Sequence, residues 1–159
     1  MINRFILYTL TLLLTVTGLN GCSRRTVIHH YEKVPVDGWT PGDTLKFAID
    51  SIRTSGNYVP VIGVRTSPAV LYPYRNLWLA IRQVWHNPES VRTDTIECVL
   101  TEKNGTNNGN GVSIYQYEFP QKSFHLEQGS CGEISVNHIM RNDILPGITE
   151  VGLLIKQTN

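Results

Sequence analysis

The chain has 159 residues, of which 41% are hydrophobic and 17% charged, and its formal net charge is +1 at pH 7. This near-neutral balance lacks the basic surface that nucleic-acid binding requires, and the many apolar residues exclude a disordered chain. The length allows one domain with a substantial core.

The first 22 residues predict a bacterial lipoprotein signal. Arg4 precedes an apolar run from Phe5 to Leu19, which is shorter than the roughly twenty residues of a membrane-spanning helix. The run ends at Gly21-Cys22, and no Ala-x-Ala cleavage site is present. We expect removal of residues 1–21 and attachment of acyl chains such as palmitate to Cys22, which anchors the protein to a membrane. The alternative is an uncleaved signal anchor in which Cys22 is incidental.

Two further cysteines, Cys98 and Cys131, remain after this cleavage. An exported domain permits a disulfide bond between them. The alternative is two separate buried thiols, because free cysteine packs like a small hydrophobic residue. The sequence leaves both open, since a bridge depends on how closely the fold brings the two Cα atoms together.

Short strands predominate after an irregular start. Residues 22–42 are expected to form the lipidated N-terminus and a tether, because Pro35 and Pro41-Gly42 interrupt regular structure. Alternating apolar residues then predict strands over 43–50, 58–66, 76–85, 91–101, 112–119, 132–140 and 148–157. In the second of these strands, Pro60 indicates an edge position or a bulge.

The alternation also predicts which side chains face the core. They are Leu45, Phe47 and Ile49; Leu77, Leu79 and Ile81; Ile96, Cys98 and Leu100; Val112 and Ile114; Ile134, Val136 and His138; and Val151, Leu153 and Ile155. No long segment has the helical period of 3.6 residues. The expected fold is therefore all-β, with residues 43–159 forming one jelly-roll-like β-sandwich of about eight antiparallel strands.

No catalytic, cofactor-binding or metal-binding motif is found. The five histidines lack metal-ligand spacing, and Gly-x-Ser-x-Gly and His-Glu-x-x-His are absent. The Asn- and Gly-rich segment 103–111 is interpreted as a turn, because a phosphate-binding loop would end in Gly-Lys-Ser/Thr before a helix.

Four short motifs follow the signal in a defined order. They are Gly38-Trp39, Gly42–Leu45, Tyr72–Leu77 and Ile144–Ile148, the last running into Val151-Gly152-Leu153. Their order and spacing resemble the GldH family of gliding-motility-associated lipoproteins of Bacteroidota, over essentially the whole chain. The resemblance implies an outer-membrane lipoprotein of the gliding apparatus, which is coupled to type IX secretion, with other gliding or secretion lipoproteins as partners. It supplies no catalytic residues, and Cys98 and Cys131 are not part of the family pattern.

Two groups of residues have both a structural and a functional interpretation. Tyr72, Tyr74 and Arg75 either form a turn around Pro73 or provide a candidate docking surface, since exposed tyrosine and arginine are common interface anchors. Three Asp–Ser/Thr–aliphatic sequences, with acceptors Thr44, Ser51 and Thr95, resemble the O-glycosylation pattern of exported Bacteroidota proteins. The alternative for these three sequences is ordinary turn and strand chemistry.

The expected function is a structural or interaction subunit and not an enzyme. The runner-up is a glycan-binding sandwich with an aromatic platform drawn from Trp39, Tyr72, Tyr74 and Trp85, an analogy that burial of these rings would contradict. A hydrolase is the third hypothesis, and it needs a nucleophile or convergent carboxylates in a cleft. The basic Ser23-Arg24-Arg25 segment after Cys22 predicts the inner leaflet of the outer membrane, with the domain in the periplasm.

Overall fold

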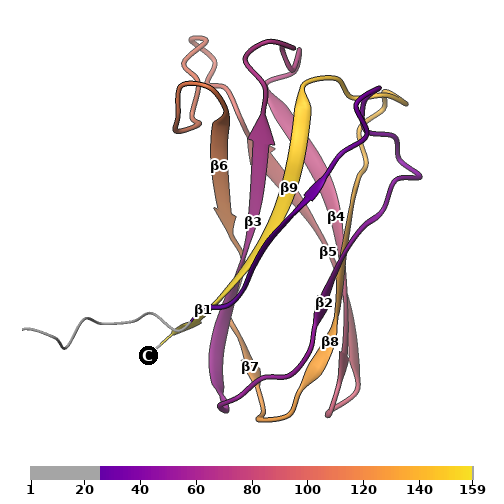
Figure 1. The fold of residues 1–159 in the computed structure, drawn as a ribbon, viewed down its shortest axis with the longest axis vertical. Helices are drawn as coiled ribbons and strands as arrows, with labels where there is room; N and C mark the ends of the chain where they lie inside the picture. Colours follow the sequence, from indigo (N-terminus) through magenta and orange to yellow (C-terminus); the bar gives the residue numbers. More distant parts are fainter. Residues whose placement is uncertain (1–25, 159) are drawn as a thin grey trace, which may run out of the picture.

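A computed structural model of the protein, which describes residues 26–158, shows two antiparallel sheets packed face to face (Figure 1). The first sheet has the order β1-β9-β3-β6, with β7 also paired to β3, and the second has the order β2-β8-β4-β5. The strands are β1 (Thr26–Lys33), β2 (Leu45–Ile49), β3 (Gly56–Thr66), β4 (Asn76–His86), β5 (Ser90–Val99), β6 (Tyr115–Pro120), β7 (Phe124–Leu126), β8 (Cys131–His138) and β9 (Ile148–Thr158). Residues 26–158 contain no helix that could cross a membrane.

The strand pairing is nested from the two ends of the chain toward its middle. β1 pairs with β9, β2 with β8, β3 with β6 and β4 with β5, and every pair is antiparallel. Such a folded-over hairpin, divided between two sheets, is the jelly-roll arrangement. The predicted fold class is therefore confirmed, with nine strands in the described part of the chain where about eight were expected.

The predicted inward faces are confirmed in most strands, because a two-residue period records which face of a sheet is buried. The inward positions of β2, β4, β8 and β9 are buried, and His138 is among them. The prediction for Val112 and Ile114 is wrong. Both are exposed and precede β6, where Tyr117 is the buried residue instead.

The predicted tether over residues 22–42 is wrong in its extent. Thr26–Lys33 forms β1, whose partner is β9, and Trp39 bridges to Leu145. The sandwich therefore begins well before the expected boundary at residue 43. No residue of β1 is fully buried, so the apolar alternation that reveals other strands is weak here. The predicted signal over residues 1–21, and Cys22 itself, lie outside the described residues.

Pro60 lies in a central strand, which contradicts the expected edge position or bulge. β3 is flanked by β9 on one side and by β6 and β7 on the other. Pro60 faces the break between β6 and β7, where its carbonyl accepts a hydrogen bond of 2.8 Å from the N–H of Gln121. Proline has no N–H to donate, and at this break the ladder requires none.

A pair of glycines in the first sheet leaves room for an aromatic side chain of β1. Gly63 of β3 is paired with Gly152 of β9, and Gly152 is also paired with Tyr31 of β1. The Tyr31 ring covers both glycines, and the Arg65 guanidinium stacks 3.7 Å from the ring centre. A Cβ at Gly152 would lie 2.6 Å from ring carbons of Tyr31. The absence of side chains at these positions therefore allows Tyr31 to lie flat on the sheet.

We expect Gly152→Ala to destabilise the protein by about 1–3 kcal/mol, because the new methyl group would displace the Tyr31 ring. In a Tyr31→Ala background the same substitution should cost much less, since the ring is gone. Urea unfolding of the four proteins of this double-mutant cycle measures the coupling. An equal loss of unfolding free energy in the two backgrounds would show that the position of the Tyr31 ring does not depend on the glycine pair.

Candidate functional site

Four long loops gather at one end of the sandwich, which we call the distal end (Figure 1). They cover residues 34–44, 67–75, 100–114 and 139–147. β1 begins at the opposite end, because Thr26 pairs with Lys156 near the end of β9. The motifs that carry the family resemblance lie mainly in three of these loops, so the residues of this end are the first candidates for a functional site.

Trp39 closes the core beneath the distal loops. It is fully buried, and its backbone exchanges two hydrogen bonds, of 3.0 and 2.9 Å, with Leu145. The indole N–H donates to the carbonyl of Asp43 at 2.7 Å. The Asp43 carboxylate in turn accepts hydrogen bonds from the Thr40 side chain and backbone, which lower the pKa of Asp43. The Gly38-Trp39 and Gly42–Leu45 motifs thus form one structural unit.

The third and fourth motifs also contact each other. Gly147 has a φ of 81°, and a Cβ there would clash with the backbone at Val70–Tyr72, so this close approach requires glycine. Tyr72 is buried, its hydroxyl donates to the carbonyl of Asn76 at 2.9 Å, and burial raises its pKa. Tyr74 packs edge-on against Tyr72, with 5.4 Å between ring centres.

The predicted docking surface is therefore only partly available to a partner. Tyr72 is buried, Tyr74 is half-buried and Arg75 is exposed. The carbonyl of Arg75 accepts hydrogen bonds from the N–H groups of Leu100 and Thr101, so this segment has a structural role. Tyr72 cannot serve as a contact residue without leaving the core.

Exposed apolar side chains project from the same loops. Val36 and Leu71 are 103% and 79% exposed, and Val70 and Ile144 are both more than half exposed. The loops that carry them touch, since Gly38 abuts the Ile144 side chain and Gly147 abuts the Val70 backbone. We call these four residues the distal apolar surface. Sequence reasoning missed them, although apolar residues inside a loop rich in turn-forming residues are a usable signal of exposure.

His138 lies between the sheets, directly below Trp39. Its ring is fully buried and packs edge-on against the indole, with 5.3 Å between ring centres. Neither ring nitrogen makes a hydrogen bond to a described residue. Burial lowers the pKa of His138 from its usual 6.5, and the nearby Trp39 backbone and the carboxylates of Asp43 and Asp143 oppose this shift. The neutral form is therefore the one that the core accepts.

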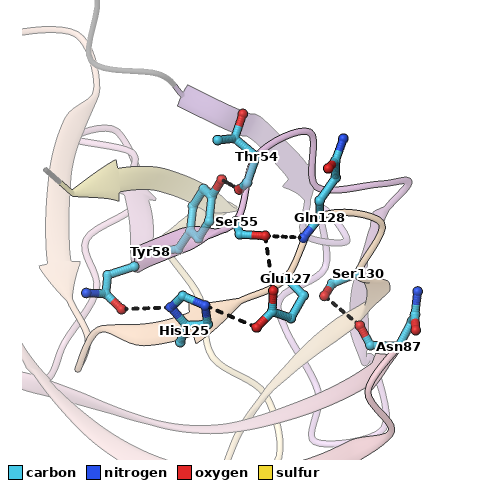
Figure 2. Close-up of polar contacts among 9 residues, drawn as sticks. Thr54, Ser55, Tyr58, Asn87, His125, Glu127, Gln128 and Ser130 are labelled. Atoms are coloured by element: carbon cyan, nitrogen blue, oxygen red, sulfur yellow. Dashed lines mark hydrogen bonds and ion pairs between the residues drawn. The ribbon is translucent and has the colours of Figure 1, made fainter.

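The opposite end carries a polar cluster that resembles a catalytic site only in composition. Figure 2 shows Ser55 and His125 both bound to Glu127, at 3.1 and 3.3 Å. Ser55 also accepts a hydrogen bond from the Gln128 N–H. In a Ser-His-acid triad the histidine stands between the serine and the acid, whereas here the carboxylate stands between the other two. The contacts join the 50–55 loop to the turn after β7.

The aromatic platform expected for glycan binding does not form. Trp39, Tyr72 and Trp85 are buried in the core, and only Tyr74 is partly accessible. The candidate glycosylation acceptors Thr44, Ser51 and Thr95 are all exposed, and their modification stays a prediction. Across residues 26–158 no group of three or more His, Cys, Asp or Glu side chains is arranged to hold a metal ion.

Cys98 and Cys131 are free thiols, so the candidate disulfide does not form in this structure. Cys98 of β5 is paired with Leu77 of β4, and Cys131 of β8 is paired with His86. Leu77 and His86 lie at opposite ends of β4, about 30 Å apart at 3.3 Å per residue. Burial raises the pKa of the Cys98 thiol to about 12, which keeps it protonated.

A family model described as GldH lipoprotein matches residues 26–155. No curated protein matches the sequence significantly. Similar solved structures include an uncharacterised Listeria monocytogenes EGD-e protein in complex with glucose, magnesium and calcium (15% identity, TM-score 0.40, 76% of this chain and 9% of that one). Another is Eiger TNF from S. frugiperda (8% identity, TM-score 0.37, 85% of this chain and 94% of that one). A third is dimeric latent PorU from Porphyromonas gingivalis (11% identity, TM-score 0.31, 86% of this chain and 14% of that one). The chain thus spans under a tenth of the Listeria protein, and structural similarities this distant bear on neither function nor partners.

We expect the stability of the domain to fall as the pH drops below about 6.5, because the unfolded chain then binds a proton that buried His138 resists. Above that pH the contribution of His138 is constant. His138→Phe keeps the ring contact with Trp39 and removes both unpaired nitrogens. Urea unfolding at pH 7.5 and 5.5 should show a smaller loss for the variant, with equal or greater stability at pH 7.5. A pH dependence unchanged by the substitution would contradict this assignment.

Proposed function

The chain belongs to the GldH lipoprotein family, and we propose that it is a lipid-anchored, non-catalytic interaction subunit of the gliding-motility apparatus. The observation that carries this proposal is the family match over residues 26–155, which covers almost all of the sandwich. The coupling of that apparatus to type IX secretion belongs to the same proposal.

The anchor in this proposal is the lipid on Cys22. Three residues separate Cys22 from Thr26, the first residue of β1, and the four Cα–Cα steps between them can span at most about 14 Å. The sandwich would therefore stay close to the membrane. We assign it to the inner leaflet of the outer membrane, facing the periplasm. Support comes from the basic Arg24-Arg25 pair and from Ser23, which stands where inner-membrane lipoproteins commonly have aspartate.

The contact surface in this proposal is the distal apolar surface, and the partners are other gliding or secretion-system lipoproteins. Exposed apolar side chains gathered on touching loops are typical of interaction sites. Trp39 and Tyr72 hold the loops from below, so the surface is supported by the core. A glycan-binding role receives no comparable support, because most of the rings it requires are buried.

Anchoring and membrane side can be tested together. Protease treatment of intact cells should leave the wild-type protein uncut, and lysis should expose it, because a periplasmic domain is shielded by the outer membrane. Cys22→Ser should remove the mass of the acyl chains and leave residues 1–21 attached, because no other cleavage site is present in that segment. Loss of the wild-type protein from unlysed cells would place the domain on the cell surface and contradict the assignment.

The contact surface can be tested with Leu71→Glu and Ile144→Glu in a gliding host that depends on this protein. Both positions are exposed, so the fold and melting temperature should be unchanged. Co-purification of envelope lipoproteins and the rate of cell spreading should each fall about tenfold, because a charge in an apolar contact is strongly unfavourable. Thr54→Glu adds the same charge at the opposite end and should behave as wild type. Normal spreading in the loop variants would rule out this surface.

A further inference from the structure

The second sheet ends in β5, and no strand within residues 26–158 pairs with its outer edge. β5 is ten residues long, contains no proline or glycine, and pairs with β4 without any shift in register. It is the last strand in the order β2-β8-β4-β5. A long, regular and unpaired edge of this kind is a template for pairing with another strand.

The free backbone groups of β5 can be identified from its neighbour. Trp78 of β4 directs its N–H and its carbonyl toward the residues that follow β8, with bonds to Met140 and Ile139. Because the directions of the backbone groups alternate along a strand, the odd-numbered residues of β4, such as Leu77 and Leu79, direct their N–H and C=O groups toward β5. Their partners on β5 are even-numbered, which leaves Val91, Thr93, Thr95 and Glu97 with N–H and C=O groups directed outward. At the far end the Val99 carbonyl is already bound by Asn108.

Two charges without an ion-pair partner, Arg92 and Asp94, lie beside this edge on the inner face of β5, and the Arg92 guanidinium lies 5.4 Å from the centre of the Phe124 ring. Arg92 and Asp94 are paired with Gln83 and Ile81, which face the core, and both are exposed. Neither takes part in an ion pair within residues 26–158. They line an open cleft of about 520 Å³ between β5 and the segment that joins β6 to β7. A strand added to β5 would cover this cleft and meet both charges.

We propose that the occupant of this edge is β5 of a second copy of the chain, paired antiparallel about a two-fold axis at Thr93. In this register Thr93 lies opposite itself and Val91 lies opposite Thr95 of the second copy. All the outward backbone groups of these three residues are satisfied. Arg92 then lies opposite Asp94 of the second copy, and the symmetry repeats this pair, so both charges gain an ion-pair partner.

Neighbouring registers are less favourable. An axis at Arg92 or at Asp94 would place like charges directly opposite each other, which is destabilising in a sheet. An axis at Thr95 would place Arg92 opposite Cys98, so the charges would stay unpaired. The register at Thr93 also matches β-branched residues on the outer face, where Val91 is 61% exposed in the single chain.

The symmetry of this pairing is compatible with two lipid anchors in one membrane. A two-fold axis perpendicular to the second sheet leaves the first sheets of both copies on the same side. β1 belongs to the first sheet, so the β1 strands of both copies lie on that side, with their first residues at opposite ends of the dimer, and a membrane parallel to the first sheets could hold both anchors. Confinement to that surface raises the effective concentration of each copy for the other. This inference does not depend on the motility role.

The test is cysteine cross-linking of the full-length lipoprotein in its native membrane, in a Cys131→Ser background. Thr93→Cys should give a disulfide-linked homodimer on oxidation, because Cα atoms of a hydrogen-bonded antiparallel pair lie about 5.5 Å apart. Thr95→Cys is the matched control on the same edge, and we expect about tenfold less dimer. More dimer from Thr95→Cys than from Thr93→Cys, or none from either, would overturn the proposal. A cross-link only to a different protein would also overturn it.

The charge pairing is tested within the Thr93→Cys protein. Arg92→Asp should lower dimer formation about tenfold, because Asp would then face Asp94 of the second copy. Adding Asp94→Arg reverses the pair and should restore the dimer, which a merely structural loss would not allow. Melting curves of the extracted variants confirm that each is folded. Failure of the reversed pair to restore cross-linking would exclude this register.

Discussion

The rest of the structure depends on the position of β9 between β1 and β3. The last strand supplies a ladder to each neighbour, and its inward residues Val151, Leu153 and Ile155 are completely buried. Among residues 26–158, β1 has no other strand partner, so this first strand is held in the sheet by β9. The first sheet therefore cannot be completed until residues 148–158 have been synthesised. Pairing across such a long sequence separation also predicts slow folding compared with a helical domain of this size.

The strands that could be predicted from the sequence are those whose own residues alternate between apolar and polar, because one face of the strand is buried. β2, β4 and β8 alternate because one face of each is buried, and this pattern is local. β1 has no fully buried residue and β7 has only three residues, so neither has a local pattern to read. The rule for Pro60 is correct for a backbone that lacks an N–H, but the break between β6 and β7 that accommodates it is a property of the sheet. The separation of Cys98 from Cys131 likewise follows from register, which no local pattern contains.

At the distal end, the residues that carry the family resemblance differ in role from those proposed to bind a partner. Trp39, Leu145 and Gly147 join loops to one another through burial, backbone hydrogen bonds and close approach. Leu71 and Ile144 lie in the same loops, and their side chains are exposed to solvent. The motif residues therefore fix the positions of the loops. The proposed contact surface consists of other residues, which these loops carry. For Tyr72 the structural alternative therefore holds and the docking alternative does not, whereas the exposed Leu71 beside it was not singled out from the sequence.

The open side of the sandwich has a physical cause in β5. The inward positions that hold apolar residues in β2 and β4 are occupied in β5 by Arg92 and Asp94, which resist burial, so the first sheet does not close over this strand. Inward-pointing charges are also a means of discouraging indiscriminate pairing at an edge, because an incoming strand without matching charges would bury them unpaired. A second copy of β5 carries the same two charges in the opposite direction. The feature that excludes most partners is thus the one that a symmetric partner satisfies.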